Sequence, residues 1–216
     1  MKYKAVIFDL DGTLLDTLQD ISDSVNESLK HLGFSEHKLE AIRYFIGEGM
    51  DVLAARALPE DNRDADTVTR LVELINNEYS IRWENKTVPY NGIPDLLDEL
   101  TVRGLLIAVL SNKPQKFTEL LISEMLSQWH FETVAGALPS VAKKPDPMAA
   151  LRIAQQLELQ PEEFLYVGDS GIDMRTAIGA GMYPIGVSWG FRSAEELFNN
   201  GAQALIEYPT DLLVFI

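Results

Sequence analysis

Residues 5–14 read AVIFDLDGTL and carry the clearest structural pattern of the chain. Its first four residues are apolar and stop at a carboxylate, Asp9, and Gly12 follows shortly after. A short, uniformly apolar run that ends in a turn is typical of a strand buried on both faces of a parallel sheet. The stretch therefore predicts a strand that delivers Asp9 and Asp11 to the edge of a sheet.

The same pattern recurs along the chain. Further apolar runs stop at a polar residue or a turn: Leu105–Leu110 before Ser111, Phe164–Val167 before Gly168 and Asp169, and Tyr183–Val187 before Ser188. Parallel strands align their carboxyl ends along one edge, where open α/β sheets bind ligands. We therefore expect Asp9, Ser111 and Asp169 to lie close together.

Helical patterns lie between these runs. The expected helices are 116–129, 147–159, 173–180 closed by Gly181, and a final one that opens with the Ser193 and Glu196 capping pattern and ends at Gly201. Strands that alternate with helices predict a Rossmann-like parallel sheet with right-handed crossovers and helices on both faces. The fold class expected for most of the chain is therefore α/β.

Residues 15–85 differ from the rest, because they have helical periodicity and no convincing strand. Helices are expected at 18–32, 50–58 and 65–83, and residues 86–94, with two prolines and Gly92, suit a linker. The sequence thus predicts an α/β core of residues 1–14 and 86–216, interrupted by an all-helical cap of residues 15–85.

Two carboxylates, Asp9 and Asp11, stand at i and i+2 just where the first strand ends. Their side chains point the same way in an extended chain, and they repel each other unless a cation or a shared proton intervenes. Asp169 ends another strand, and the three together offer only oxygen ligands, which favours Mg²⁺ over zinc. The sequence predicts a magnesium site at this edge.

Four short motifs in order resemble those of the haloacid dehalogenase-like phosphatases. They are D-x-D-G-T from Asp9, a later Ser at Ser111, Lys-Pro at Lys144, and G-D-S-x-x-D from Gly168 to Asp173. Each motif alone is weak evidence, but the four in the family's order span most of the core.

This resemblance implies roles for individual residues. Asp9 would be a nucleophile that forms an aspartyl-phosphate, and Asp11 the acid and base. Ser111 would hydrogen-bond the phosphoryl group, and Lys144 would neutralise its charge. Asp9, Asp169 and the backbone carbonyl of Asp11 would hold Mg²⁺.

Two further residues are expected around the metal ligands. Asp173 would act on those ligands from outside the coordination sphere or orient Lys144, with Ser170 beside it. Simpler readings stay open for some of these residues, because Ser111 could cap the next helix and Asp173 could be a first-turn acid favoured by the helix dipole.

The helical insert resembles the cap of the subfamily that contains phosphoglycolate phosphatases, pyrophosphatases and β-phosphoglucomutases. Within it, Ile46-Gly47-Glu48-Gly49 and Arg56 resemble the phosphoglycolate phosphatase pattern. Amides near Gly47 and Gly49 and the guanidinium of Arg56 would then meet a substrate carboxylate, with Asn112 also expected to bind substrate. Arg56 could equally be an exposed helix residue.

Composition limits the partners. With 33 acidic against 18 basic residues and a formal charge of -15, general nucleic-acid binding and docking on anionic membranes are disfavoured. The absence of cysteine excludes a thiol nucleophile, and no apolar stretch reaches membrane-spanning length. We expect a cytoplasmic protein whose partner is a small phosphorylated metabolite, and its oligomeric state stays open.

The function favoured at this stage is Mg²⁺-dependent hydrolysis of a small phosphate monoester, with 2-phosphoglycolate the first candidate. A β-phosphoglucomutase-like phosphoryl transfer or a pyrophosphatase would use the same core residues. A phosphate-sensing module is the alternative outside enzymes, and the intact Asp11 argues against it, because a sensor needs no acid-base group beside its phosphate acceptor.

Overall fold

A six-stranded sheet forms the centre of the larger of two units. The computed structural model describes residues 2–139 and 141–216. The strands are β1 (Ala5–Phe8), β4 (Leu106–Pro114), β5 (Thr133–Ala137), β6 (Phe164–Gly168), β7 (Tyr183–Val187) and β8 (Ala204–Ile206). Their order is β5-β4-β1-β6-β7-β8 and every pairing is parallel, so the predicted α/β sheet is confirmed.

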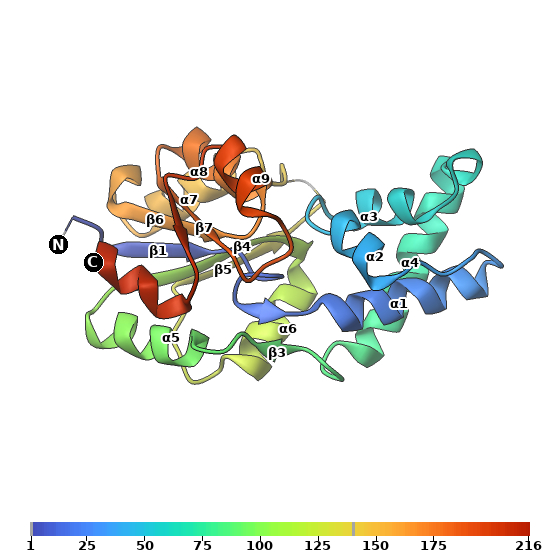
Figure 1. The fold of residues 1–216 in the computed structure, drawn as a ribbon, viewed down its shortest axis with the longest axis horizontal. Helices are drawn as coiled ribbons and strands as arrows, with labels where there is room; N and C mark the ends of the chain where they lie inside the picture. Colours follow the sequence, from blue (N-terminus) through green and yellow to red (C-terminus); the bar gives the residue numbers. More distant parts are fainter. Residues whose placement is uncertain (1, 140) are drawn as a thin grey trace.

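Alternate residues of each strand enter different hydrophobic clusters, because successive side chains point to opposite faces of a sheet. Val6 and Phe8 of β1 belong to one cluster, whereas Ala5 and Ile7 belong to the other. The first cluster is completed by α5 (Ile93–Val102), α6 (Gln115–Met125) and the 3-10 helix η3 (Pro209–Phe215), the second by α7 (Met148–Gln156) and α8 (Gly171–Ala180). The sheet is therefore covered on both faces (Figure 1).

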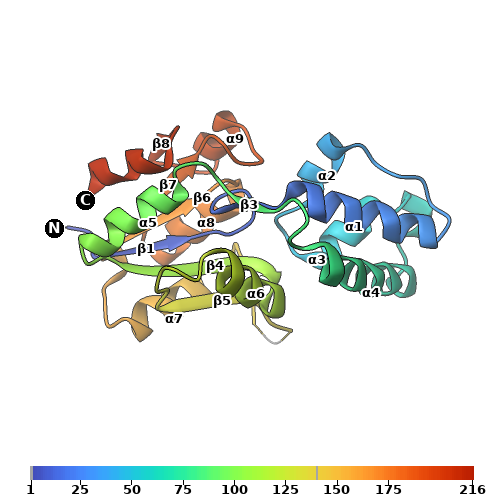
Figure 2. The same ribbon diagram turned by 90° about the horizontal axis from the view of Figure 1, so that it is seen from below.

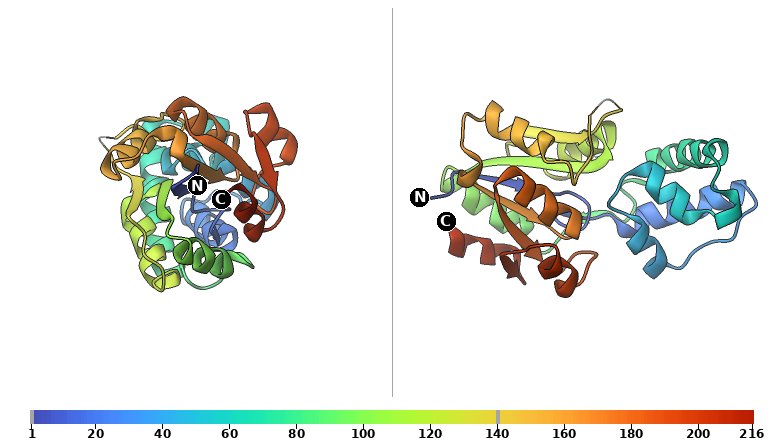
Figure 3. Two further views of the ribbon diagram at one scale, coloured as in Figure 1. Left: turned by 90° about the vertical axis from the view of Figure 1, so that its left-hand side faces the viewer. Right: turned by 90° about the horizontal axis from the view of Figure 1, so that it is seen from above.

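Four helices form the second unit, beyond the carboxyl ends of the strands. They are α1 (Leu18–His31), α2 (Leu39–Phe45), α3 (Met50–Ala57) and α4 (Ala65–Arg82), with a short 3-10 helix η1 (Glu60–Asn62) between the last two. They have a hydrophobic core of their own, which includes Val25, Leu29, Leu71 and Ile75. Both chain termini lie at the far end of the sheet from this cap (Figures 1 and 3).

The two units are joined by a small antiparallel ribbon of β2 (Leu15–Asp16) and β3 (Val88–Pro89). Figure 2 shows both crossings side by side. Asp20 in the first turn of α1 accepts hydrogen bonds from the backbone N–H groups of Lys86 and Thr87, at 2.9 and 2.8 Å, and so ties the second crossing to the cap. The boundaries predicted at 14/15 and 85/86 stay a prediction and lie next to this ribbon.

Some elements differ from the sequence predictions. Helices α2 and α5 and strands β2, β3, β5 and β8 were not predicted, so the segment 15–85 is not wholly helical, and α9 (Ala194–Asn199) is shorter than the pattern suggested. The linker expected at 86–94 ends earlier, because Gly92 takes a left-handed conformation and Pro94 fits the first turn of α5. Helix α6 stops at Met125 rather than near Trp129, since Leu126 leaves the helical conformation. The stop of α8 at a left-handed Gly181 is confirmed.

Candidate active site

Asp9 follows β1 at the carboxyl edge of the sheet, and hydrogen bonds fix both its backbone and its side chain. Its N–H donates to the carbonyl oxygen of Val167 on β6 at 2.9 Å, and its Oδ1 atom accepts from the N–H of Leu10 at 2.7 Å. Oδ1 also receives the ammonium of Lys144 at 2.8 Å. These interactions of the described residues all fall on Oδ1, so Oδ2 remains available to a ligand.

Lys144 lies between two carboxylates. Its Nζ atom is 2.8 Å from Asp9 and 2.7 Å from Oδ1 of Asp173, and its side chain is 2% exposed. Burial lowers the pKa of Lys144, but the two carboxylates outweigh burial and hold the pKa well above its ordinary value. Lys144 is therefore a fixed positive charge behind Asp9.

Asp173 has the two roles that the sequence left as alternatives. As the third residue of α8 it forms a capping box with Ser170, whose N–H and hydroxyl donate to Oδ2 at 3.1 and 2.6 Å. Its Oδ1 accepts from Lys144. Both oxygens thus orient neighbouring groups, which suits a residue placed behind the metal ligands.

Asp169 stands beside Asp9. Its Oδ2 accepts from the N–H of Phe191 at 2.6 Å, and Gly12 approaches it so closely that a Cβ at position 12 would lie 2.3 Å from Oδ2. Gly12 also has a φ of +85°, a region that favours glycine. The D-x-D-G motif is therefore a tight turn packed directly against Asp169.

Buried carboxylates gather here in a set that fits a divalent cation. Asp9, Asp169 and Asp173 each offer an oxygen, and these oxygens lie within 4.8 Å of one another. Burial raises the pKa of Asp9 to about 7, with Asp173 adding to the rise and Lys144 opposing it. Burial, then Asp173 and Asp9, raise the pKa of Asp169 well above its usual range. Excess negative charge on oxygen-only donors matches the preferences of Mg²⁺.

The Asp11 side chain lies apart from these carboxylates. Its Oδ1 accepts from the hydroxyl of Thr17 at 2.7 Å, and both its oxygens face the ammonium of Lys113, at 3.0 and 3.3 Å. The metal contact predicted for Asp11 involves its backbone carbonyl and stays a prediction. Asp11 instead lies beside the β2–β3 ribbon that joins the two units, with Thr17 and Lys113 as the partners of its side chain.

Asn112 links the lysine segment to the cap. Its amide donates to the carbonyl oxygens of Lys144 and Gly47, both at 2.9 Å, and its Oδ1 accepts from the N–H of Lys144 at 2.8 Å. Ser111 precedes it inside β4 and accepts from the N–H of Lys113 at 3.2 Å, so it does not cap a helix here. The polar groups of Asn112, predicted to bind substrate, are all used on the protein itself.

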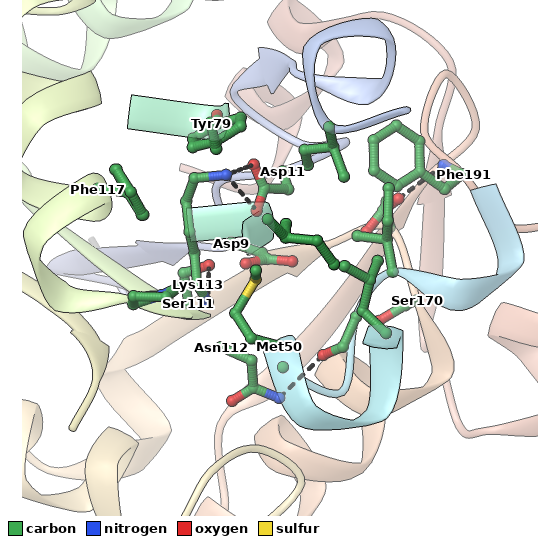
Figure 4. A pocket seen from close by; sticks show the side chains of 18 of the residues that line it. Asp9, Asp11, Met50, Tyr79, Ser111, Asn112, Lys113, Phe117, Ser170 and Phe191 are labelled. Atoms are coloured by element: carbon green, nitrogen blue, oxygen red, sulfur yellow. Dashed lines mark hydrogen bonds and ion pairs between the residues drawn. The ribbon is translucent and has the colours of Figure 1, made fainter. Parts of the chain in front are cut away.

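A cavity of about 60 Å³ lies between the cap and this edge of the sheet. Asp9, Asp11, Ser111, Asn112 and Asp169 line its core side (Figure 4). Most of its remaining wall is apolar and comes from both units: Ile21, Ile46, Met50, Leu53, Ile75 and Phe117.

The predicted cap residues separate into two groups. Gly47 and Gly49 line the cavity with left-handed φ values of +123° and +94°. Arg56 does not reach it, because its guanidinium pairs with Glu48 and points to the carbonyl oxygens of Tyr44 and Phe45 on α2. The expected contact of Arg56 with a substrate is therefore not supported, and its alternative reading as a surface helix residue fits.

Two arginines, Arg192 of the core and Arg43 of the cap, connect the two units by hydrogen bonds, and we call these contacts the clasp. Arg192, in the loop after β7, donates to the carbonyl oxygens of Arg43 and Ile46 at 2.7 Å each and to that of Tyr44 at 3.4 Å. Arg43 in turn donates to the carbonyl oxygen of Gly190.

Lys113 is the residue of this site that the sequence analysis missed. It is buried, lines the cavity, and lies 4.3 Å from the ring centre of Tyr79 on α4. The available signal was its position, since it is the third polar residue of Ser111-Asn112-Lys113 after an apolar strand. An isolated lysine is most often a solvated surface residue, so position alone did not single it out.

Comparison with known proteins identifies the same family as the sequence motifs. The model of the haloacid dehalogenase-like hydrolases matches residues 6–187. The phosphoglycolate phosphatase of Nitrosospira multiformis is 35% identical over 208 residues, which cover 94% of this chain and 91% of that protein. That of Pseudomonas putida is 36% identical over 192 residues, covering 87% and 70%. The crystal structure of a predicted phosphoglycolate phosphatase from Haemophilus somnus superposes with a TM-score of 0.93 at 25% identity, covering 100% of this chain and 98% of that one.

Proposed function

The chain belongs to the haloacid dehalogenase-like hydrolases, and from this premise we propose that it is a Mg²⁺-dependent phosphatase that forms an aspartyl-phosphate on Asp9. The observation that carries the proposal is the charge arrangement at Asp9. Oδ1 of its carboxylate is held by Lys144, and Asp9 lines the cavity between the core and the cap. A nucleophile needs such a fixed orientation with one reactive oxygen free.

In the first step, Oδ2 of Asp9 attacks phosphorus and the bond from phosphorus to the ester oxygen breaks. Asp11 gives its proton to the leaving alcohol. Lys144 offsets negative charge on Asp9 throughout, and Ser111 donates to a phosphoryl oxygen. These roles rest on the family motifs together with the distances described above.

In the second step, a water molecule loses a proton to Asp11 and attacks phosphorus, and the bond from phosphorus to Asp9 breaks. Inorganic phosphate leaves and Asp9 is restored. Asp9 and Asp169 are the side chains that would hold Mg²⁺, with Asp173 orienting Lys144 behind them. Bound Mg²⁺ would supply positive charge that lets two anions, carboxylate and phosphate, approach each other.

The proposed substrate is a small phosphate monoester, and 2-phosphoglycolate is the first candidate because it gives the relatives from Nitrosospira multiformis and Pseudomonas putida their names. The cavity that Asp9, Asp11 and Asp169 line is the proposed binding site for this substrate. No helix in residues 2–139 and 141–216 is long and apolar enough to cross a membrane. We retain a cytoplasmic location and a small phosphorylated metabolite as proposals.

The experiment measures phosphate release from 2-phosphoglycolate, pyrophosphate, sugar phosphates and p-nitrophenyl phosphate, with Mg²⁺ or EDTA. Asp9→Asn is compared with Asp95→Asn, an exposed aspartate on α5. We expect Mg²⁺-dependent release that only Asp9→Asn abolishes. Activity retained by a folded Asp9→Asn protein would sink the mechanism, and conversion of glucose 1-phosphate without phosphate release would make the protein a mutase.

A further inference from the structure

Lys113 is a buried cation that lines the cavity beside Asp11, the proposed acid. Its side chain is 5% exposed, and its Nζ atom faces Asp11 at 3.0 Å and the Tyr79 ring at 4.3 Å (Figure 4). Burial lowers the pKa of Lys113, but the attraction of Asp11 outweighs burial and raises the pKa above its ordinary value. The side chain is therefore an ammonium ion.

The other cations near the cavity are already committed. Lys144 is held by Asp9 and Asp173 behind the nucleophile. Arg192, the other positively charged residue among the described residues that line the cavity, is engaged by three carbonyl oxygens of the cap. Arg56 points away toward Glu48.

Most of the rest of the cap wall cannot stabilise an anion. Ile46, Met50, Leu53 and Ile75 present hydrocarbon and a thioether to the cavity, and an ionised carboxylate buried against such a surface without a partner is strongly disfavoured. Apart from the backbone near Gly47 and Gly49, a carboxylate on the leaving group has Lys113 as the cation that the geometry leaves for it.

Lys113 is paired with Asp11, the residue proposed as the acid and base. Asp11 must carry a proton to the leaving oxygen, and it keeps a second hydrogen bond of 2.7 Å from Thr17 when the ammonium is withdrawn. An exchange of one carboxylate for another leaves Lys113 paired before and after the substrate binds, while Asp11 keeps its hydrogen bond from Thr17.

We propose that Lys113 is the specificity-determining residue for the leaving group, and that it exchanges Asp11 for a carboxylate of the substrate. The inference rests on the proposed phosphatase function. It assigns as substrates small phosphate monoesters whose alcohol carries a carboxylate close to the ester oxygen.

The test compares 2-phosphoglycolate with 2-hydroxyethyl phosphate, which is of similar size and lacks the carboxylate. The variants are Lys113→Met, which keeps the length of the side chain without its charge, Lys113→Arg, and Lys116→Met as an exposed control three residues away. The readout is the ratio of kcat/KM for the two esters, in which any general effect on Asp11 cancels.

We expect the wild type to favour 2-phosphoglycolate by about 100-fold, the scale associated with one buried charge pair. Lys113→Met should bring the ratio close to one, mainly through KM for 2-phosphoglycolate. Lys113→Arg should restore part of the preference, and Lys116→Met should leave the ratio unchanged. A folded Lys113→Met protein that loses activity on both esters equally would overturn the inference, as would an unchanged ratio.

Binding measured by calorimetry separates this inference from the proposed function. In the Asp9→Asn background, with no turnover required, Lys113→Met should weaken binding of 2-phosphoglycolate by at least about 30-fold and leave 2-hydroxyethyl phosphate within about threefold. Wild type that hydrolyses neither ester would refute the phosphatase proposal, while the binding comparison would still decide on Lys113. Equal affinity for 2-phosphoglycolate of the Asp9→Asn protein and of the double variant with Lys113→Met would refute the role of Lys113. If Lys113→Met does not fold, Lys113→Arg decides the question. A preference that is reduced but not abolished in that folded variant, without a change for 2-hydroxyethyl phosphate, supports the contact, and an unchanged preference refutes it.

Discussion

The clasp between Arg192 and the cap is expected to set how long the cap stays closed. Arg192 is 9% exposed at its side chain, and Arg192→Met removes its three hydrogen bonds to the carbonyl oxygens of α2 and the following turn while keeping an apolar stem. Hydrogen bonds from a charged donor contribute about 1.5–3 kcal/mol each. One of the three is long at 3.4 Å and exposed, and water replaces all three when the cap opens.

We therefore expect a net shift of about 2–3 kcal/mol toward the open state, which corresponds to roughly a 30- to 150-fold change in the open-to-closed ratio. The chain has no cysteine, so two labels can be introduced without removing any native thiol. Ile81 on α4 and Val102 at the end of α5 are 70% and 83% exposed and stand on the two units. Energy transfer between dyes at Ile81→Cys and Val102→Cys should show a second population in Arg192→Met.

Arg56→Met is the matched control, because Arg56 also reaches a carbonyl oxygen of α2 but lies wholly within the cap. It should leave the distribution of transfer efficiencies as in the wild type. A distribution in Arg192→Met that coincides with the wild type would refute the reasoning. A shift of equal size in Arg56→Met would show that the cap itself, rather than its clasp, had changed.

Gly12→Ala should weaken Mg²⁺ binding more than tenfold in a calorimetric titration, because the new methyl group meets Oδ2 of Asp169, and it should lower stability by about 1–2 kcal/mol through the left-handed φ. Gly33 is the matched control, because its φ is +78° and nothing lies within 4 Å of a new Cβ. Gly33→Ala should share the loss of stability and keep the Mg²⁺ affinity of the wild type. Equal Mg²⁺ affinities of Gly12→Ala and Gly33→Ala would contradict the steric argument. In EDTA, the free energy of unfolding should fall as pH rises from about 4 to about 7, because folded Asp9, with its pKa raised from 3.8 to about 7, holds a proton that the unfolded chain has released. The expected loss of unfolding free energy is on the order of a few kcal/mol, and Mg²⁺ should reverse it at pH 8. Denaturant unfolding of wild type and Asp9→Asn across this pH range measures the loss. Wild-type stability that rises with pH between about 4 and about 7 would exclude the raised pKa of Asp9.

Local sequence was sufficient for the catalytic edge of the sheet. Four apolar runs ending at a polar residue predicted β1, β4, β6 and β7, since a strand buried on both faces must be apolar throughout and its first polar residue marks the edge. The carboxyl ends of parallel strands then had to bring Asp9, Ser111 and Asp169 together. Strand β5, with Gly136 in a short half-buried run, has no such pattern and was missed.

The identity of the neighbours across the cavity was decided only by tertiary structure. Arg56 and Arg192 look alike in sequence, yet one pairs within the cap and the other crosses to it. Lys113 became a site residue because Tyr79, far along the chain, packs over it beside Asp11. Such pairings depend on how α4 and α2 sit over the sheet, which is set by packing between the units and not by any local pattern. The sequence by itself thus determined the acidic groups and their edge of the sheet, and the tertiary structure determined which side chains surround them in the cavity.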